Sequence, residues 1–115
     1  MITSLNLTPA VLNIDVYAGD TEEFQVYFVT SEDVAIDVSE YTWSAQIREY
    51  RTSTDFNAIE VNADNANLGV LLVSVPASVT ENLPQNSVWD LQGVYSGNPT
   101  TFLQGKVTCT KDVTR

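Results

Sequence analysis

The stretch that decides the fold is YTWSAQIREY, residues 41–50. Apolar and polar residues alternate along it, so that Trp43, Ala45 and Ile47 share one face and only polar side chains occupy the other. An alternation with a period of two is typical of a β-strand that is buried on one side. Trp43 brings a large indole to the buried side, where a side chain of that size usually lies at the centre of a core. The stretch therefore predicts a half-buried β-strand around which the rest of the chain packs, and it indicates no chemistry.

Further stretches with strand character lie on both sides of it, separated by turns rich in Gly, Asn, Asp and Ser. They are residues 5–17 with an interruption at Pro9, 22–30, 34–38, 56–61, 70–75, 87–95 and 101–110. A helical signal is confined to one turn at 78–83, where Ser78 and Glu81 match a capping box. Short strands at this spacing predict one domain, residues 1–115, folded as an all-β antiparallel sandwich of seven or eight strands with an immunoglobulin-like outline.

The expected core consists of apolar residues that fall in phase within these strands. Trp43 matches the core tryptophan of immunoglobulin-like sandwiches, although the single cysteine excludes an internal disulfide. Cys109 falls in phase with Leu103 and Val107, which predicts a buried and unreactive thiol. The predicted core residues are Trp43, Ile47, Phe24, Phe28, Leu72, Trp89, Leu91 and Val107.

The chain is strongly acidic, with 15 Asp and Glu residues against 5 Lys and Arg residues and a net charge of −10. Eight acids and no base precede Arg48. Such a balance opposes binding to nucleic acid or to an anionic membrane, because both require basic side chains on the protein. Two interpretations of the acids stay open: a solubilising surface, or an electrostatic face for a basic partner.

The N-terminus has neither the basic region nor the continuous apolar region of a secretory signal. No apolar run approaches the ~20 residues that cross a bilayer. We therefore expect the protein to be made in a cytoplasm and to stay or assemble there. Residues 1–9 are polar and punctuated by Pro9, which predicts a flexible or strand-donating arm that pairs with a neighbour's sheet.

Residues that carry chemistry are scarce in this chain. It has no histidine and one cysteine, which excludes histidine-based catalysis and cysteine metal clusters. Glu32, Asp33 and Asp37 offer oxygens to a calcium ion, but they lack the glycine and the closing glutamate of an EF-hand, so a solvated loop is the other interpretation. The sequence accordingly predicts no enzyme, no catalytic residue, no cofactor and no metal ligand.

Three segments together resemble a family of phage proteins. The first is YAGDT, residues 17–21, followed by an alternating strand, and the second is IDVSEYTWSAQIR, residues 36–48. The third runs from Leu91 through LQGKVT, residues 103–108, to DVTR, residues 112–115. In this order and spacing they resemble the N-terminal domain of phage baseplate upper proteins over nearly the whole chain. That domain is a β-sandwich that attaches receptor-binding or fibre components to the virion.

The resemblance implies a non-enzymatic structural protein of a phage tail, baseplate or fibre attachment. It would assemble in the host cytoplasm with other virion proteins, as a homotrimer or a ring. The alternative is a capsid decoration or cement protein or the base of a head fibre, since the family's domain often precedes a fibrous extension and these 115 residues contain none. An alternative of another class is a carbohydrate-binding module that stacks sugars on its 2 tryptophans and 5 tyrosines. The phase of both tryptophans, however, predicts burial.

The position of the charges predicts which surface meets other copies. The turns of a sandwich gather at its two ends, and Asp20, Glu22, Glu32 and Asp33 fall in turns. Self-association through such an acidic end would be repulsive. We therefore expect contacts between copies to use the surface near four of the 5 bases, which are Arg48, Arg51, Lys106 and Lys111.

Overall fold

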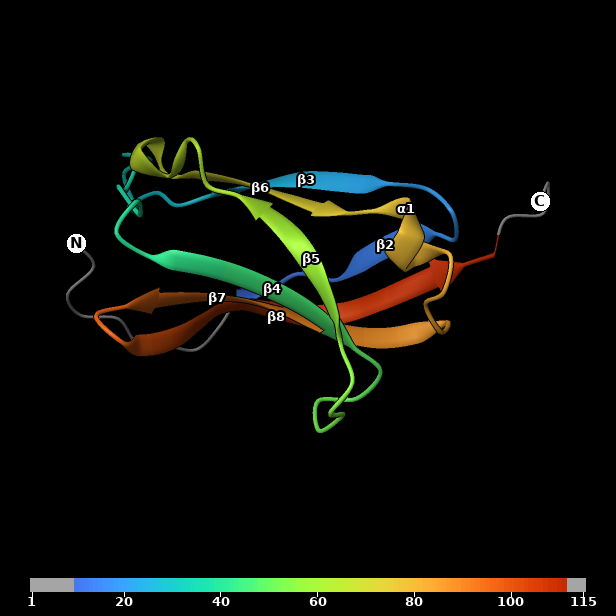
Figure 1. The fold of residues 1–115 in the computed structure, drawn as a ribbon. Coiled ribbons are helices and arrows are strands. Elements are labelled where there is room, and N and C mark those ends of the chain that lie inside the picture. The colour runs from blue at the N-terminus through green and yellow to red at the C-terminus, as the bar shows by residue number, and fades with distance from the viewer. Residues whose placement is uncertain (1–9, 112–115) are drawn as a thin grey trace.

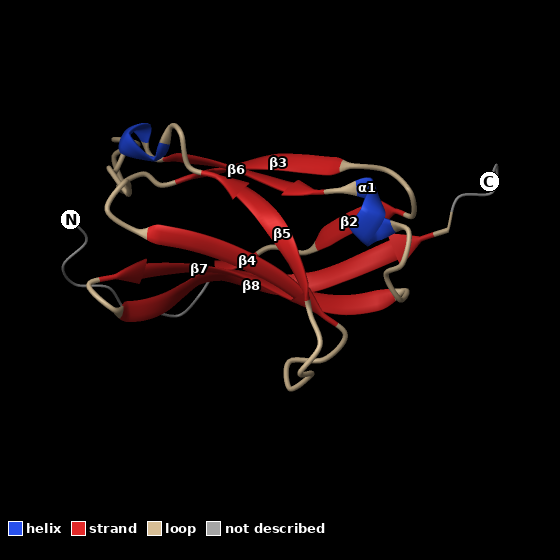
Figure 2. Ribbon diagram, viewed as in Figure 1, coloured by secondary structure: helices blue, strands red, loops and turns tan. Residues whose placement is uncertain are grey.

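The structure of the protein is a computed structural model in which residues 10–111 are described. It is built from strands and two short helical turns, so the prediction of an all-β fold is confirmed (Figures 1 and 2). The predicted strand at 5–7, the arm at 1–9 and the motif at 112–115 lie outside the described residues. The elements are β1 (Ala10–Val11), β2 (Ile14–Tyr17), β3 (Glu22–Tyr27), β4 (Thr42–Arg48), β5 (Asn57–Asn62), a 3-10 helix (Ala66–Leu68), β6 (Val70–Val75), α1 (Ala77–Thr80), β7 (Asn86–Tyr95) and β8 (Asn98–Thr110).

The strands form one curled, 8-stranded sheet with the order β1-β8-β7-β4-β5-β6-β3, and β2 also pairs with β8. β5 turns the sheet back over itself, because residues 57–59 pair with β4 and residues 60–62 pair with β6. The result is a half-barrel whose two layers face each other (Figure 1). We call β1, β2, β8, β7 and β4 the large layer, and β3 with β6 the small layer. The half-barrel stays open between β2 and β3.

Two features differ from the predicted antiparallel sandwich. The two layers are joined through β5 into one sheet. In addition, β1 and β2 pair with β8 in parallel, so the sheet is mixed. The parallel direction is available because β2 and β8 come from opposite ends of the chain, and no hairpin forces them to run in opposite directions. The other strand pairs among residues 10–111 are antiparallel.

The core lies between the two layers and follows the alternation of the strands. Leu71, Val73 and Val75 of β6 point inward and are buried. Leu72 therefore lies on the outer face, outside the core predicted for it, because the run VLLVSV is apolar on both sides and conceals its phase. Among the other predicted core residues, Ile47, Trp89, Leu91 and Val107 are buried, and Phe24, Phe28 and Trp43 are partly buried and pack against them.

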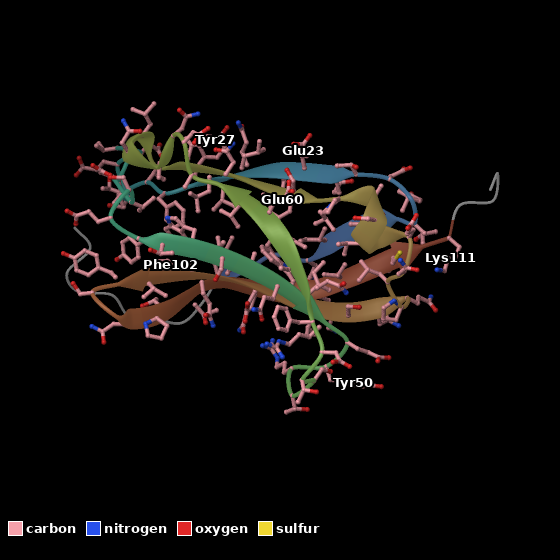
Figure 3. The ribbon with its side chains drawn as sticks, in the orientation of Figure 1. Glu23, Tyr27, Tyr50, Glu60, Phe102 and Lys111 are labelled. Atoms are coloured by element: carbon pink, nitrogen blue, oxygen red, sulfur yellow. The ribbon has the colours of Figure 1, made fainter. Side chains whose placement is uncertain are left out.

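One end of the interior is filled by aromatic rings, and we call it the aromatic end. Ring centres in contact there lie 5.1–5.6 Å apart, a spacing at which aromatic pairs attract each other. The indole Nε1 of Trp43 donates a hydrogen bond of 3.2 Å to the carbonyl oxygen of Val38. The rings belong to Phe28, Tyr41, Trp43, Tyr95 and Phe102, of which Figure 3 labels Phe102.

Two local devices make room for these rings. The register between β7 and β8 shifts beside Phe102, and this bulge lets its ring turn inward against Phe28 and Trp43. Gly93 of β7 pairs with Trp43 of β4. A Cβ atom at Gly93 would come within 2.9 Å of ring atoms of Trp43 and Tyr41. Glycine is therefore required where the indole lies over the backbone.

The opposite end of the interior, next to α1, is aliphatic and fully buried, and we call it the aliphatic end. Thr80 of α1 is buried there with its hydroxyl satisfied on both sides. The hydroxyl donates to the carbonyl oxygen of Asp20 at 2.7 Å and accepts from the N–H of Gly19 at 3.0 Å. These bonds attach α1 to the turn between β2 and β3. The aliphatic end consists of Val16, Val75, Leu83, Val107 and Cys109.

The segment between β1 and β2 is held against the large layer by side-chain hydrogen bonds. The Nε1 of Trp89 donates to the carbonyl oxygen of Leu12 at 2.8 Å, and the N–H of Lys106 donates to Oδ1 of Asn13 at 3.0 Å. A Cβ atom at Gly105 would overlap the carbonyl group of Leu12. The close approach of these two backbones thus depends on glycine.

Two smaller predictions are wrong. Residues 34–38 form no strand, and an isolated bridge between Val29 and Ala35 is found instead. The capping box at Ser78 does not form, because the chain enters α1 through Pro76 at the N-cap, which makes no side-chain hydrogen bond to the helix. Neither helical turn in the described part of the chain is long and apolar enough to cross a membrane.

Candidate functional site

Three of the four bases among residues 10–111 gather on the outer face of the large layer. Arg48 on β4 is in register with Val88 on β7, and Val88 is in register with Lys106 on β8. We call this set the basic row. Ile47 and Val107 are buried, so the side chains next to them along each strand point outward.

Arg51 joins this surface from the loop between β4 and β5. Its Nη1 donates a hydrogen bond of 3.0 Å to Oε1 of Gln104 on β8, so the side chain folds back over the strands. Gln104 is in register with Asp90, and Asp90 with Gln46. We call these three residues the amide row, after the two glutamines at its ends. It runs beside the basic row on the outer face, two residues farther along each strand.

Asp90 is the carboxylate at the centre of this surface, and it is partly buried. Burial raises its pKa, while the charges of Arg48 and Arg51 act in the opposite direction. Desolvation disfavours the ionised form, and the two guanidinium groups reduce that penalty. Beside Asp90 lies a small cavity of about 110 Å³ that is lined by Gln46, Arg48, Arg51, Val88, Trp89 and Asp90.

The guanidinium group of Arg48 is held in place by three contacts. It donates to the carbonyl oxygen of Ser53, and its Nη2 donates to Oε1 of Gln46 at 2.8 Å. Its Cζ atom also lies 4.8 Å from the centre of the Phe56 ring, within the range of a cation–π interaction. The position of this charge is therefore fixed by the loop that follows β4.

The same loop presents aromatic side chains to solvent. Tyr50 is 64% exposed and Phe56 is 49% exposed. The N–H of Tyr50 donates to Oγ of Ser53 at 3.0 Å, which closes the loop into a turn. Figure 3 shows Tyr50 on the loop that projects away from both layers. Exposed aromatic rings next to arginine are the composition that protein interfaces favour.

This surface has the chemistry to bind an acidic group. Guanidinium groups pair with carboxylates through two parallel hydrogen bonds, and lysine adds a point charge. On a protein of net charge −10 a local positive surface attracts an acidic partner to one place and keeps it from the rest. We therefore take the basic row, Arg51 and the loop aromatics as the candidate site.

The acidic loop that the sequence offers as a calcium site has a different explanation. The carboxylate of Asp37 accepts hydrogen bonds from Oγ of Ser39 at 2.6 Å and from its N–H at 2.9 Å, and these bonds lower the pKa of Asp37. Such bonds are those of a local turn. In the part of the chain that the structure describes, no group of three or more Asp, Glu, His or Cys side chains is placed to hold a metal ion.

The two tryptophans lie inside the half-barrel. Trp89 is 2% exposed and meets the ring of Phe24 edge-on, with ring centres 5.6 Å apart. Trp43 is half-buried within the aromatic end. A carbohydrate platform requires an open ring face, and neither indole provides one. The tyrosines at 17, 27 and 50 are exposed.

The predicted interface residues do not all come together. Arg48, Arg51 and Lys106 share one surface, whereas Lys111 lies beyond the end of β8, away from Tyr50 (Figure 3). Sequence reasoning missed the amide row, because its members become neighbours only once three strands are in register. The available signal was Asp90, which is the one charged residue among residues 86–95.

No protein-family model matches the chain, and no curated protein sequence matches it. The function must therefore be argued from the residues, their register and their charge. The candidate surface described above provides the starting point.

Proposed function

We propose that the chain is a non-enzymatic structural component of a phage virion, most fittingly of a tail, baseplate or fibre attachment, that works by binding neighbouring virion proteins. The resemblance of residues 17–21, 36–48 and 103–108 to the baseplate family supports the virion assignment. The observation that carries the binding role is the gathering of Arg48, Arg51 and Lys106 beside exposed aromatic rings on a protein of net charge −10.

The chemistry of the surface defines the partner as an acidic protein surface. Arginine and tyrosine are enriched among the residues that dominate binding energy at interfaces. Arg48 is already held by Ser53, Gln46 and Phe56, so little side-chain freedom is lost when it pairs with a carboxylate. Assembly of such a protein would take place in the host cytoplasm, with other virion proteins as its partners.

We further infer an immunoglobulin-like outline for the half-barrel. Three features support it: β2 lies parallel to the last strand, β4, β7 and β8 are neighbours in one layer, and β3 pairs with β6 in the other. β5 passes from one layer to the other. The large indole of Trp43 on β4 agrees with this outline.

The alternatives make different demands on the protein. A capsid decoration or cement protein would use the same surface chemistry, so the two virion locations are separated by experiment. A carbohydrate-binding module would need an open aromatic platform, and the positions of Trp43 and Trp89 do not favour it. We therefore place the structural role first.

The decisive experiment locates the chain in particles of the phage that encodes it. Antibodies against the recombinant protein should label intact particles in negative-stain micrographs, and mass spectrometry of purified particles should detect the chain. Label at the tail tip supports the tail or baseplate assignment, and label on the head supports the decoration alternative. Purified particles that lack the chain would contradict the proposal.

A second measurement tests the surface itself. Arg51→Glu should weaken binding to the neighbouring virion protein by roughly tenfold or more, because an attractive charge becomes repulsive at the interface. Lys111→Glu makes the same change of charge away from the candidate surface and is the matched control. Equal effects of the two substitutions would show that overall charge, and not this surface, controls binding.

A further inference from the structure

The outer face of the small layer, extended by residues 60–62 of β5, carries a row of charges that mirrors the basic row. Glu23 on β3 is in register with Ser74 on β6, and Ser74 is in register with Glu60 on β5. Both glutamates are exposed, and Oγ of Ser74 donates to Oε2 of Glu23 at 3.0 Å. We call these three residues the acidic row. Figure 3 shows Glu23 and Glu60 near the small layer, on the side of the molecule away from Tyr50.

The two rows have the same construction. In each of them two like charges stand on the outer two of three neighbouring strands, with a small uncharged side chain between them. Neighbouring strands are about 4.8 Å apart, so the charges of each row are roughly 10 Å apart. The basic row has Arg48 and Lys106 at this spacing, and the acidic row has Glu23 and Glu60.

The residues beside the rows also correspond. One step along the large layer lies the amide row, with Gln46 and Gln104 at its ends. One step along the small layer, Gln25 and Asn62 flank Leu72 in the same way. Each step is two residues along a strand, which is about 7 Å. When one outer face is laid on the other, the ends of the rows correspond, charge to charge and amide to amide, whereas the centres of the second rows, Asp90 and Leu72, differ.

We propose that the protein binds a second copy of itself by stacking the outer face of its large layer on the outer face of the next copy's small layer. In this contact Arg48 and Lys106 of one copy pair with the two glutamates of the acidic row of the next. The long side chains of arginine, lysine and glutamate bridge the two faces, and the loop between β4 and β5 projects at the edge of the contact (Figures 1 and 3). This inference identifies the acidic partner of the candidate site as a second copy of the chain, so it rests on the proposed role as a building block of a particle.

Charge complementarity selects a second copy as the occupant and also fixes the type of contact. Two basic rows repel each other, as do two acidic rows, so a two-fold symmetric contact through either face is disfavoured. The head-to-tail contact uses two different faces of each molecule and leaves one of each kind free. Contacts of this type generate a ring where the rotation closes, and an open stack where it does not.

Charge reversal on each face gives the test. The R48E/K106E protein has two acidic outer faces, and the E23K/E60K protein has two basic outer faces. Each alone should lose self-association at low salt, with a dissociation constant raised roughly tenfold or more in sedimentation velocity. A mixture of the two should associate again, in alternation, because every contact then joins a basic face to an acidic one.

Controls separate this result from unfolding and from net charge. Each variant is checked by its melting curve, and R51E/K106E replaces the first variant if the loss of the Arg48 contacts disturbs the loop. K111E and E32K/E40K change the charge at exposed positions away from both rows and should associate like the parent protein. Folded variants that fail to associate when mixed would overturn the inference, as would a parent protein that stays monomeric at low salt.

The outcome is independent of the location experiment. A chain that is present in particles but does not complement in the mixture refutes the stacking and leaves the virion role intact. A chain that is absent from particles but complements in the mixture supports the stacking and refutes the virion role.

Discussion

The two ends of the interior are filled by different kinds of side chain. At the aromatic end, half-buried rings fill the space between the layers through edge and tilted contacts. At the aliphatic end, side chains that are 0–2% exposed pack around α1, and the buried hydroxyl of Thr80 attaches α1 to a neighbouring turn. We therefore expect the aromatic end to adjust when a side chain changes, and we expect the aliphatic end and the buried surroundings of Trp89 to adjust less.

The largest expected effect comes from truncation of the two tryptophans. Trp89→Ala should lower the free energy of unfolding by roughly 3–5 kcal/mol, because it removes a buried ring and the hydrogen bond to Leu12. Trp43→Ala should cost less, about 2–3 kcal/mol, since its ring is only half-buried. Urea denaturation of both variants measures the difference. A larger loss for Trp43→Ala would contradict the comparison.

The next prediction compares the loss of stability caused by alanine at two glycines, Gly105 and Gly93. Gly105→Ala should cost about 2–3 kcal/mol, because the new methyl group overlaps the backbone of Leu12 and displaces the segment before β2. Gly93→Ala should cost about 1 kcal/mol, since its methyl group meets the rings of Tyr41 and Trp43, which can tilt. Thermal melts give the order, and hydrogen exchange at residues 12–17 should rise in Gly105→Ala alone.

A smaller effect tests the hydrogen bonds that the Thr80 hydroxyl makes at the aliphatic end. Thr80→Val keeps the shape of the side chain but leaves the carbonyl of Asp20 and the N–H of Gly19 without their partner. The expected loss is about 1–3 kcal/mol in unfolding free energy. Thr80→Ser retains the hydroxyl and is the matched control. A loss for Thr80→Val no larger than that for Thr80→Ser would contradict the assignment, because only the valine removes the hydrogen bonds.

The smallest effect lies on the outer surface, away from both ends. The pKa of Asp90 is raised by burial, so its ionised form weakens the fold, and stability is lost as pH rises from the unfolded pKa through the folded one. Asp90→Asn should therefore raise the melting temperature slightly at pH 7. The gain should vanish near pH 3, where the parent carboxyl is protonated in both states. A gain that persists at pH 3 would point to packing.

The short alternating stretches and the turns between them were enough to predict an all-β fold, and the alternation in residues 43–47 was enough to predict the inward face of β4. Long-range pairing was not predictable in the same way. The parallel contact of β2 with β8 joins opposite ends of the chain, and the passage of β5 between layers depends on curvature that no local pattern records. Leu72 was misplaced because apolar residues on both faces of β6 hide its phase.

The candidate site was predictable only in part. The bases stand out because they are rare. Arg48 follows Ile47 and Lys106 precedes Val107, and these two predicted core residues place both bases on the outward face of their strands. The pairing of strands is what makes them neighbours, and it also brings in Asp90 and the two glutamines. Arg51 reaches the surface through a loop whose shape depends on contacts with Ser53, which sequence patterns do not specify.

The opening of the half-barrel between β2 and β3 has a consequence for solubility at high concentration. β3 is an edge strand, and a groove of about 330 Å³ runs beside it. Unpaired edges of this kind can template fibrils by adding strands of other chains. Glu22 shares the inward phase of Phe24, and Glu23 points outward, so both sides of the edge begin with a carboxylate. An inward-pointing charge is a recognised guard against strand addition. We therefore expect part of the acidity of the chain to protect against aggregation, at the place where the sheet is left open.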